Sequence, residues 1–578
     1  MKRLLAILAL GCLGHMTMNA KNKTIELKVV ETSDVHGCFF PYDFMERKPL
    51  KGTLTRVSSY VNRLRQTHGN RVLLVDNGDI LQGQPICYFS NFIDRESPNV
   101  AAEVTNYMKY DAQTLGNHDI ETGHAVYDKW IGEVDCPMLG ANIIDTKTGK
   151  PYVKPYTILE RDGVRIAILG MLTPAIPCWL SESLWQGLAF GEMVSSARYW
   201  MNYLQEHEHP HLVFGLFHSG WDGGIKTPEY DEDAAQRVAR EVPGFDVVFF
   251  GHDHKVRQEW VVNTTGQRVL CLDPSCNAFN VAQANITVEL DQRGQLVKKI
   301  VDGEIYNVCN EPVDEQMLSH FEPTLKKVRE FVERKVGVFE KTISTRDCFF
   351  GPSAFTDFIL DLQLQITGAD ISFNAPLNFD MTIEKGPVYM SDMFKLYRYE
   401  NQIYVMMLSG EEIRKHLEMS YDLWVNTMRS PDDHIMLLND DANTDMQRYG
   451  FKNLTFNFDS AAGIDYEVDV TKPDGQKVRI LQMSNGQPFD EKKMYRVAVN
   501  SYRGNGGGEL LTRGAGIPKE ELKKRIVYQS ELDQRYYLMK EIERLGTVCP
   551  KAHNNWRFVP EAWTREALKR DRKLIFKE

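Results

Sequence analysis

Five short polar motifs in the first half of the sequence carry residue types that bind divalent metal ions. In chain order they are Asp34-x-His36, Asp76-Asn-Gly-Asp79, Gly116-Asn117-His118-Asp119, His218 and Gly251-His252-x-His254. Carboxylate, amide oxygen and neutral imidazole together suit zinc, manganese, iron or cobalt. Each motif alone is more typical of a hydrogen-bonded turn. Their joint occurrence favours a shared metal site.

The spacing within the motifs indicates how an ion could be held. A strand places residues i and i+2 on the same face, so Asp34 and His36 can address one ion together. Two ions about 3.5 to 4 Å apart need a common oxygen ligand, and a carboxylate can offer one oxygen to each. Asp79 is suited to that bridging role, so the motifs predict a dinuclear site.

The elements that must position these motifs are predicted strands that alternate with amphipathic helices, which indicates an α/β domain. Strand-like runs cover residues 25–30, 71–75, 165–169, 211–217 and 246–250. Polar motifs lie at the ends of several of these runs. Because the loops beyond the carboxyl ends of strands converge in an open α/β sheet, we expect the motifs to meet in one place.

With these five motifs in this order, the chain resembles the dinuclear metallophosphatases, and within them the 5′-nucleotidases and the 2′,3′-cyclic-nucleotide 2′-phosphodiesterase/3′-nucleotidases. The resemblance covers nearly the whole chain. It implies a four-layer α/β/β/α catalytic domain, an α+β substrate domain and two divalent ions (Zn, Mn, Co or Fe). It also implies two ligand sets: Asp34, His36, Asp79 and His254 for the first ion, and Asp79, Asn117, His218 and His252 for the second.

The resemblance implies a catalytic role for His118, which contacts the phosphate in the resembled enzymes and is oriented by an acid. The 5′-nucleotidase pattern reads Asn-His-Glu-Phe-Asp, whereas this chain has Asn117-His118-Asp119-Ile120-Glu121. Either Asp119 or Glu121 could therefore support the histidine.

The resemblance also implies that two aromatic rings of the second half hold the nucleotide base, and Tyr399 and Tyr502 match those positions. Asn374 begins Asn-Ala-Pro-Leu-Asn, which replaces an Asn-Gly-Gly-Ile-Arg element and lacks its substrate-binding arginine. Arg346 resembles another substrate arginine. The tyrosine motifs favour the cyclic-phosphodiesterase/3′-nucleotidase branch.

Composition and the first residues limit the other possibilities. A formal charge of −11 disfavours a nucleic-acid polymer as partner. Residues 1–20 combine Lys2 and Arg3, an apolar run and Ala20, which is typical of a signal peptide, and no later run predicts a membrane span. We therefore expect an exported protein, periplasmic or extracellular; lipid attachment at Cys12 is the less favoured alternative. Nine later cysteines show no disulfide framework.

The sequence thus predicts five segments and one main function. The segments are a signal peptide (1–20), a catalytic domain (21–312), a helical connector (313–337), a nucleotide-binding domain (338–559) and a C-terminal helix (560–578). The main hypothesis is a phosphoesterase acting on 2′,3′-cyclic nucleotides and 3′-nucleotides. The alternatives are a 5′-nucleotidase/UDP-sugar hydrolase and an inactive secreted nucleotide- or metal-binding protein.

Overall fold

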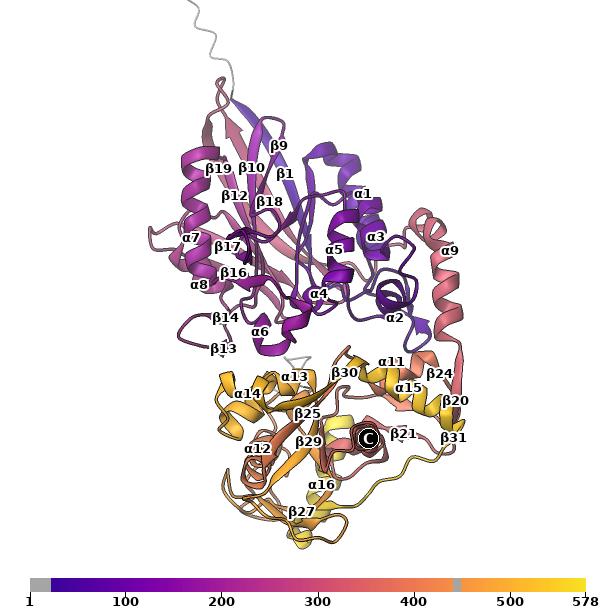
Figure 1. Ribbon diagram of the computed structural model, residues 1–578. Helices are drawn as coiled ribbons and strands as arrows, with labels where there is room; N and C mark the ends of the chain where they lie inside the picture. Colours follow the sequence, from indigo (N-terminus) through magenta and orange to yellow (C-terminus); the bar gives the residue numbers. More distant parts are fainter. Residues whose placement is uncertain (1–21, 440–448, 578) are drawn as a thin grey trace, which may run out of the picture.

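The computed structural model describes residues 22–439 and 449–577. The expected signal peptide, with Cys12, lies outside the described residues. The chain forms two domains joined by one long helix, α9 (Figure 1).

Two six-stranded sheets form the centre of the first domain. The order of the first sheet is β19 (Leu296–Asn307), β18 (Asn280–Leu290), β1 (Lys23–Thr32), β4 (Val72–Asp76), β5 (Ala112–Thr114) and β6 (Met138–Leu139). The order of the second is β16 (Val256–Val262), β17 (Arg268–Pro274), β15 (Val247–Phe250), β12 (Leu212–His218), β10 (Val164–Leu172) and β9 (Tyr156–Arg161). All five strands predicted in this half are confirmed.

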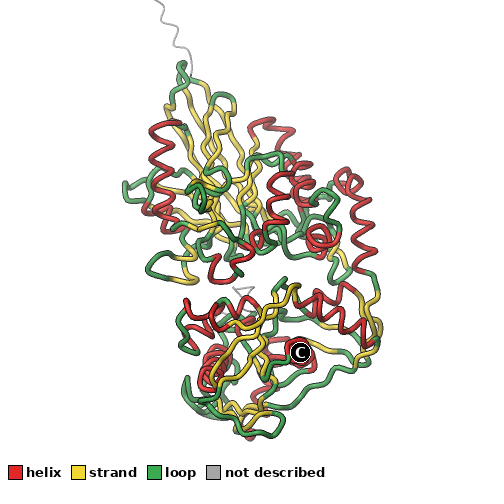
Figure 2. The backbone as a smooth tube through the Cα atoms, viewed as in Figure 1, coloured by secondary structure: helices red, strands yellow, loops and turns green. Residues whose placement is uncertain are grey.

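Helices cover the outer faces of both sheets, as the tube in Figure 2 shows. The first sheet is covered by α1 (Leu54–His68), α3 (Val100–Met108) and α5 (His124–Glu133), and the second by α7 (Met193–Tyr203) and α8 (Ala235–Glu241). A separate apolar core joins the two sheets and includes Val29, Val75, Ile168 and Leu216. These layers confirm the α/β/β/α fold.

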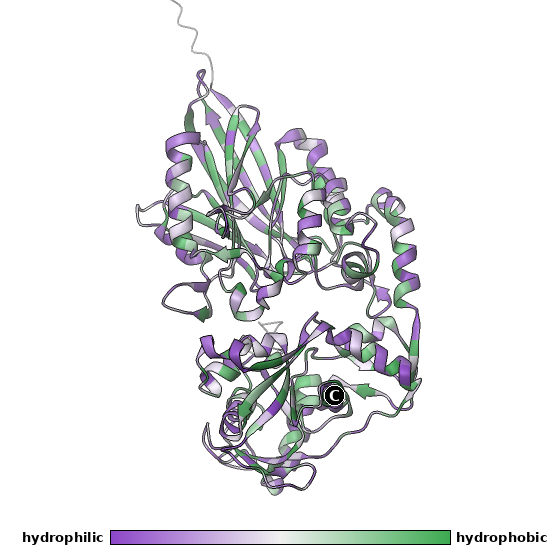
Figure 3. Cartoon of the chain, viewed as in Figure 1, coloured by the Kyte–Doolittle hydropathy of each residue, from purple (hydrophilic) through white to green (hydrophobic). Residues whose placement is uncertain are grey.

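The parallel strands at the centre are apolar along their whole length because both of their faces are covered. All seven residues of β12 are buried, and β12 pairs in parallel with β10 and β15. Figure 3 shows much green within the sheets and much purple on the surrounding helices. His218, the last residue of β12, lies at the carboxyl edge of the second sheet. Its ring contacts the carbonyl of Asn77, which follows β4 at the carboxyl edge of the first sheet, so the two edges meet there.

Helix α9 (Glu315–Val332) joins the domains and occupies most of the expected connector. Pro323 lies inside this helix without ending it. One face of α9 packs into the core of the catalytic domain through Phe321, Leu325 and Val328. The helix is therefore fixed to the first domain, and the next strand, β20 (Lys335–Phe339), begins the second.

The second domain is built around a mixed five-stranded sheet with helices packed on it. Its strand order is β26 (Ser460–Ala462), β22 (Ile371–Asn374), β29 (Met494–Asn500), β25 (Gln402–Ser409) and β30 (Ile526–Asp533). A smaller sheet contains β28 (Val478–Met483), β27 (Ile464–Asp469) and β32 (Trp556–Val559), and β20 pairs with β24 (Gly386–Tyr389) and β31 (Thr547–Val548). The main helices are α10 (Ala354–Thr367), α11 (Met390–Leu396), α12 (Gly410–Trp424) and α15 (Gln534–Leu545).

The last helix, α16 (Glu561–Phe576), packs one face on this domain and exposes the other. Asp571, on the packed face, accepts hydrogen bonds from the ring of His434 and the backbone of Met436. The nine cysteines of the described residues are free thiols. No helix within the described ranges is long and apolar enough to cross a membrane.

Candidate dinuclear metal centre

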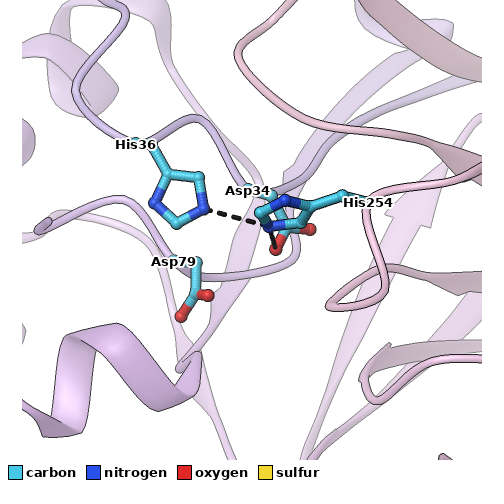
Figure 4. A group of neighbouring side chains, drawn as sticks. All are labelled: Asp34, His36, Asp79 and His254. Carbon is cyan, nitrogen blue, oxygen red and sulfur yellow. Dashed lines mark hydrogen bonds and ion pairs between the residues drawn. The ribbon is translucent and has the colours of Figure 1, made fainter. Parts of the chain in front are cut away.

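The structure brings together the four residues expected to hold a first ion. Asp34, His36, Asp79 and His254 converge from loops that follow β1, β4 and β15 (Figure 4), with one potential ligand atom from each within 4.8 Å of the others. Nε2 of His254 lies 3.1 Å from Oδ1 of Asp34 and 3.1 Å from Nε2 of His36.

The second expected set lies beside the first and shares Asp79 with it. Nε2 of His218 is 3.3 Å from Oδ2 of Asp79 and 3.1 Å from Oδ1 of Asn117. The rings of His218 and His252 are 5.3 Å apart, and Asp79, His218 and His252 form one compact group. Because Asp79 belongs to both sets, its carboxylate would be able to offer one oxygen to each of two ions.

The hydrogen bonds behind these histidines fit metal binding. Nδ1 of His36 bonds the carbonyl of Gln82 at 3.1 Å, and Nδ1 of His218 bonds the carbonyl of Asn77 at 2.6 Å. A ring that donates from Nδ1 presents a lone pair at Nε2. With this tautomer the Nε2 lone pair of His218 converges with oxygens of Asp79 and Asn117, a set of three acceptors that a divalent cation would satisfy together, in place of a proton on Nε2. The donor set fits divalent ions of the zinc and manganese kind.

Several of these residues adopt a left-handed backbone that is rare for residues with side chains. The positive φ values are 50° for Asp34, 49° for His36, 57° for Asp79, 79° for His252 and 56° for His254. Each such conformation costs about 1 kcal/mol or more, and strain of this kind gathers at functional sites. The local backbone is therefore set by the ligand geometry rather than by intrinsic preference.

Two glycines allow the ligand loops to approach one another closely. A Cβ atom on Gly116 would lie 2.1 Å from Oδ1 of Asp79, and one on Gly251 would lie 2.5 Å from Oδ2 of Asp34. Neither position tolerates a side chain while the carboxylates keep their places.

Of the two acids near His118, Glu121 contacts its ring. Oε2 of Glu121 lies 2.6 Å from Nδ1 of His118. Asp119 turns the other way and accepts backbone N–H groups of Asp79, Ile80, Leu81 and Gly116 at 2.7 to 3.0 Å. His118 lies at the start of α4 (Asn117–Ile120), so Glu121 follows it by one helical turn. Asp119 instead fixes the loop that carries Asp79.

The electrostatics of the site favour positive charge. Burial lowers the pKa of His118, but the charges of Asp79 and Glu121 outweigh it and raise the pKa to about 9. Burial also lowers the pKa of His218, and Asp79 and Asp34 raise it to about 9. The negative electrostatic potential of the carboxylates therefore outweighs the effect of burial at His118 and His218. His36 differs, because burial and the neighbouring His254 lower its pKa to about 3.

The second domain brings Tyr399 close to His118. The rings of Tyr399 and His118 are nearly parallel, with centroids 6.0 Å apart and an angle of 7°. Tyr502, the other predicted ring, lies in α13 (Ser501–Gly504) and packs against Gly507 and Phe456. Both tyrosines are only partly buried. Their exposure fits a role in ligand binding better than a role as core residues.

The other two predicted substrate residues lie in contacts within the second domain. Arg346 forms a bidentate pair with Asp380, at 2.6 and 2.9 Å, and its guanidinium lies over Phe576. Asn374 ends β22, is 2% exposed and donates to the carbonyl of Ala375. No contact of either residue with the metal cluster is found among the described residues, and their substrate role stays a prediction.

The structure adds residues that the sequence motifs did not reveal. The Cys276 thiol lies beside His254. Burial alone would raise the pKa of this thiol, but the interaction with His254 outweighs burial, and the pKa is lowered overall. Glu232 and Asp233 lie 3.2 and 3.9 Å from Nε2 of His252. The acidic run that contains them was the only signal in the sequence. Phe456, edge-on to Tyr502 at 6.1 Å, lay too far along the chain to be linked with it.

Comparisons with known proteins match both halves of the chain. Residues 27–256 match the family model of the calcineurin-like phosphoesterases, and residues 335–513 match the 5′-nucleotidase C-terminal domain.

Two curated relatives and one solved structure are similar over most of the chain. The trifunctional nucleotide phosphoesterase protein of Bacillus subtilis is 26% identical over 93% of this chain and 39% of its own length. The 2′,3′-cyclic-nucleotide 2′-phosphodiesterase/3′-nucleotidase of Yersinia enterocolitica is 25% identical over 94% of this chain and 89% of its own. A putative 5′-nucleotidase from Staphylococcus aureus has the same fold, with a TM-score of 0.75 and 20% identity, over 92% of this chain and 99% of its own.

Proposed function

Because the chain belongs to the metallophosphatases that join a calcineurin-like phosphoesterase domain to a 5′-nucleotidase C-terminal domain, we propose that it hydrolyses phosphate esters of nucleosides. We favour 2′,3′-cyclic nucleotides and 3′-nucleotides as substrates. The relative from Yersinia enterocolitica, named for these two activities, aligns with 94% of this chain.

The observation that carries the proposal is the meeting of the two domains at His118. The catalytic domain supplies the paired ligand sets and the His118–Glu121 contact of 2.6 Å. The second domain supplies Tyr399, parallel to the His118 ring. An aromatic ring beside phosphoester chemistry suits a substrate that has both a base and a phosphate.

We assign the first ion to Asp34, His36, Asp79 and His254, and the second to Asp79, Asn117, His218 and His252. Two divalent ions there would polarise the phosphoryl oxygens and make water nucleophilic near neutral pH. Glu121 holds Nδ1 of His118, so Nε2 is the atom that faces the substrate and can donate to the phosphoryl oxygens as charge develops. Asp119 keeps the Asp79 loop in place through its backbone hydrogen bonds.

A 5′-nucleotidase or UDP-sugar hydrolase is the second candidate. It is supported by the match of residues 335–513 to the 5′-nucleotidase C-terminal domain. The two candidates share the metal chemistry and differ in which ester oxygen reaches the ions. Which ester oxygen reaches the ions depends on how the ribose is oriented when the base is bound by the two tyrosines.

One assay distinguishes these candidates. Phosphate release from 2′-, 3′-, 5′- and 2′,3′-cyclic AMP should be compared with protein reconstituted with Mn²⁺, Co²⁺ or Zn²⁺. We expect the cyclic and 3′ esters to react fastest. Tyr399→Ala and Tyr502→Ala should each raise KM by about 5- to 150-fold, since stacking contributes about 1 to 3 kcal/mol per base. Unchanged KM values in both variants would refute the stacking role.

Removal of the ions separates an enzyme from a binding protein. Chelation should abolish hydrolysis, and added metal should restore it. Nucleotide binding without any hydrolysis by the metal-loaded protein would instead support the inactive binding protein.

Export is a separate part of the proposal. It is supported by the basic start, apolar run and small residue of positions 1–20. Mass spectrometry of the mature N-terminus should show cleavage after this segment. A lipid on Cys12 would favour the anchored form, and an intact leader in the cytoplasmic fraction would contradict export.

A further inference from the structure

Arg398 is a half-buried arginine that has no acidic partner among the described residues. It belongs to the loop of residues 397–401, between α11 and β25, which also carries Tyr399. Its guanidinium carbon lies 5.7 Å from the Tyr399 ring, and Tyr399 in turn lies parallel to His118. The positive charge is therefore held where the two domains meet, next to the predicted site of the base.

Across the interface, Arg398 faces the side of the first ligand set. Its electrostatic neighbours are Tyr399 and Tyr449 of its own domain and Cys276 and Cys38 of the catalytic domain. Cys38 follows the ligand His36 by two residues, and Cys276 lies beside the ligand His254. The guanidinium is thus beside the Tyr399 ring and within electrostatic reach of groups that neighbour the first ion site.

Hydrogen bonds from a buried arginine fix the backbone of the loop that carries Arg398. Arg535, which is fully buried, donates to the carbonyls of Tyr397 and Arg398 and to the carboxylate of Glu400 at 2.8 Å. Glu400 is the only acid within the loop, and Arg535 already occupies it. Arg398 consequently has a fixed backbone and a side chain free to bind something else.

An uncompensated guanidinium in a partly desolvated place is costly, and an anionic ligand with two oxygens removes that cost. A phosphate matches the planar fork of arginine bidentately. The position at which the resembled 5′-nucleotidases carry an arginine is Asn378 here, whose side-chain amide donates to the carbonyl of Lys395 at 2.8 Å. That position supplies no cation in this chain.

We infer that Arg398 binds the phosphate of the nucleotide from the second domain and so supplies, from a different loop, the charge that position 378 lacks. The inference rests on the proposed function, because it assumes that the substrate carries a base and a phosphate. It makes Arg398 a specificity-determining residue: an ester with both groups engages Tyr399 and Arg398 together, whereas a nucleoside engages only the ring.

The test compares Arg398→Gln and Arg398→Lys with Arg479→Gln, a matched change at an arginine whose side chain is 72% exposed and paired with Glu467 on the distal sheet. KM should be measured for 3′-AMP and 2′,3′-cyclic AMP, and inhibition constants for adenosine and inorganic phosphate. Calorimetry should measure phosphate binding directly.

For Arg398→Gln we expect KM and the phosphate inhibition constant to rise about 10- to 100-fold, the range of a charged hydrogen bond. The inhibition constant of adenosine should stay within about twofold of the wild-type value. The KM and phosphate inhibition constant of Arg398→Lys should lie between those of the wild type and Arg398→Gln, and those of Arg479→Gln should equal the wild-type values.

Two results would overturn the inference. One is phosphate binding by Arg398→Gln that equals the wild type. The other is an equal loss for adenosine and phosphate, which would mean that the loop, rather than the charge, had been disturbed. If the wild type hydrolysed no nucleotide, the proposed function would fail, and calorimetry with inorganic phosphate would still decide whether Arg398 binds an anion.

Discussion

His118 shows how a single residue depends on the direction in which its neighbours point. Its ring can act on a phosphate only if the proton lies on the right nitrogen, and the partner of Nδ1 decides this. Glu121 is that partner, at 2.6 Å, and its side chain is only 7% exposed. Because this contact is largely shielded from solvent and sets the proton position on His118, its loss should lower kcat more than it changes substrate binding.

We predict that Glu121→Gln lowers kcat for nucleotides by about 10- to 100-fold, the usual cost of losing an orienting partner, with little change in KM. The amide keeps the size of the acid but not its charge. Steady-state kinetics should be measured together with metal content. A variant with normal kcat would show that Glu121 does not orient the histidine.

Asp119 should behave differently, although it lies only two residues before Glu121. Each of its carboxylate oxygens accepts two backbone N–H groups. In Asp119→Asn, an NH₂ group would face two donors, at a cost of about 1 to 3 kcal/mol. We predict a lower thermal midpoint and reduced metal content. Loss of kcat with unchanged stability and two bound ions would contradict this structural role.

At the scale of elements, the ligand loops are shaped by strand ends that lie side by side. The apolar runs predicted the strands, and the polar motifs at or just beyond their ends, such as His218 at the end of β12, predicted that the candidate ligands would meet. The division of those residues into two ligand sets came from the family resemblance. The sequence did not distinguish Asp119 from Glu121, because that choice depends on how α4 turns against the Asp79 loop. The sequence also predicted that Arg346 binds substrate. It did not reveal that Arg346 pairs with Asp380, because that contact depends on the fold of the second domain.

Gly116 tests how closely these loops must approach. In Gly116→Ala the new Cβ would lie 2.1 Å from the Asp79 carboxylate oxygen and 2.4 Å from its backbone nitrogen. Because Asp79 belongs to both ligand sets, we predict that fewer than two ions remain bound per chain, as measured by elemental analysis. Gly132→Ala, at a position with open space around it, is the control and should bind metal normally.

Helix α10 carries a carboxylate that should make stability depend on pH. Burial raises the pKa of Asp357 to about 6 from its ordinary 3.8, although the backbone N–H of His553 opposes this. The folded state holds the proton more tightly than the unfolded state. The favourable contribution of this proton is complete below about pH 4 and is lost as pH rises through about 6.

We therefore predict that Asp357→Asn gains stability relative to wild type between about pH 4 and 7, by at most about 3 kcal/mol. The asparagine oxygen can still accept the His553 N–H. Thermal midpoints across this range measure the difference. A difference that does not change with pH would contradict a raised pKa.

At the scale of the whole molecule, we expect activity to need both domains, because the proposed ion ligands and the proposed base-binding tyrosines belong to different ones. The sequence could not predict how the domains meet, since the contacts join residues hundreds of positions apart. Tyr88 of the catalytic domain lies under the Arg535 guanidinium at 4.9 Å and bonds Asp533 through its hydroxyl at 3.3 Å. The same Arg535 holds the loop that carries Tyr399. This junction thus links the domain interface to the base platform.

We predict that Tyr88→Leu raises KM for nucleotides several-fold. A desolvated cation–π contact contributes about 2 kcal/mol, and without it part of the substrate binding energy is used to bring the two domains together. Hydrolysis of p-nitrophenyl phosphate, which needs only the ions, should change little. The control is Lys523→Ala, which breaks an interdomain ion pair whose side chains are 79% and 54% exposed. Such pairs contribute under about 1 kcal/mol, so KM should stay within about twofold. Equal effects of the two substitutions would show that the junction at Tyr88 does not hold the domains in register.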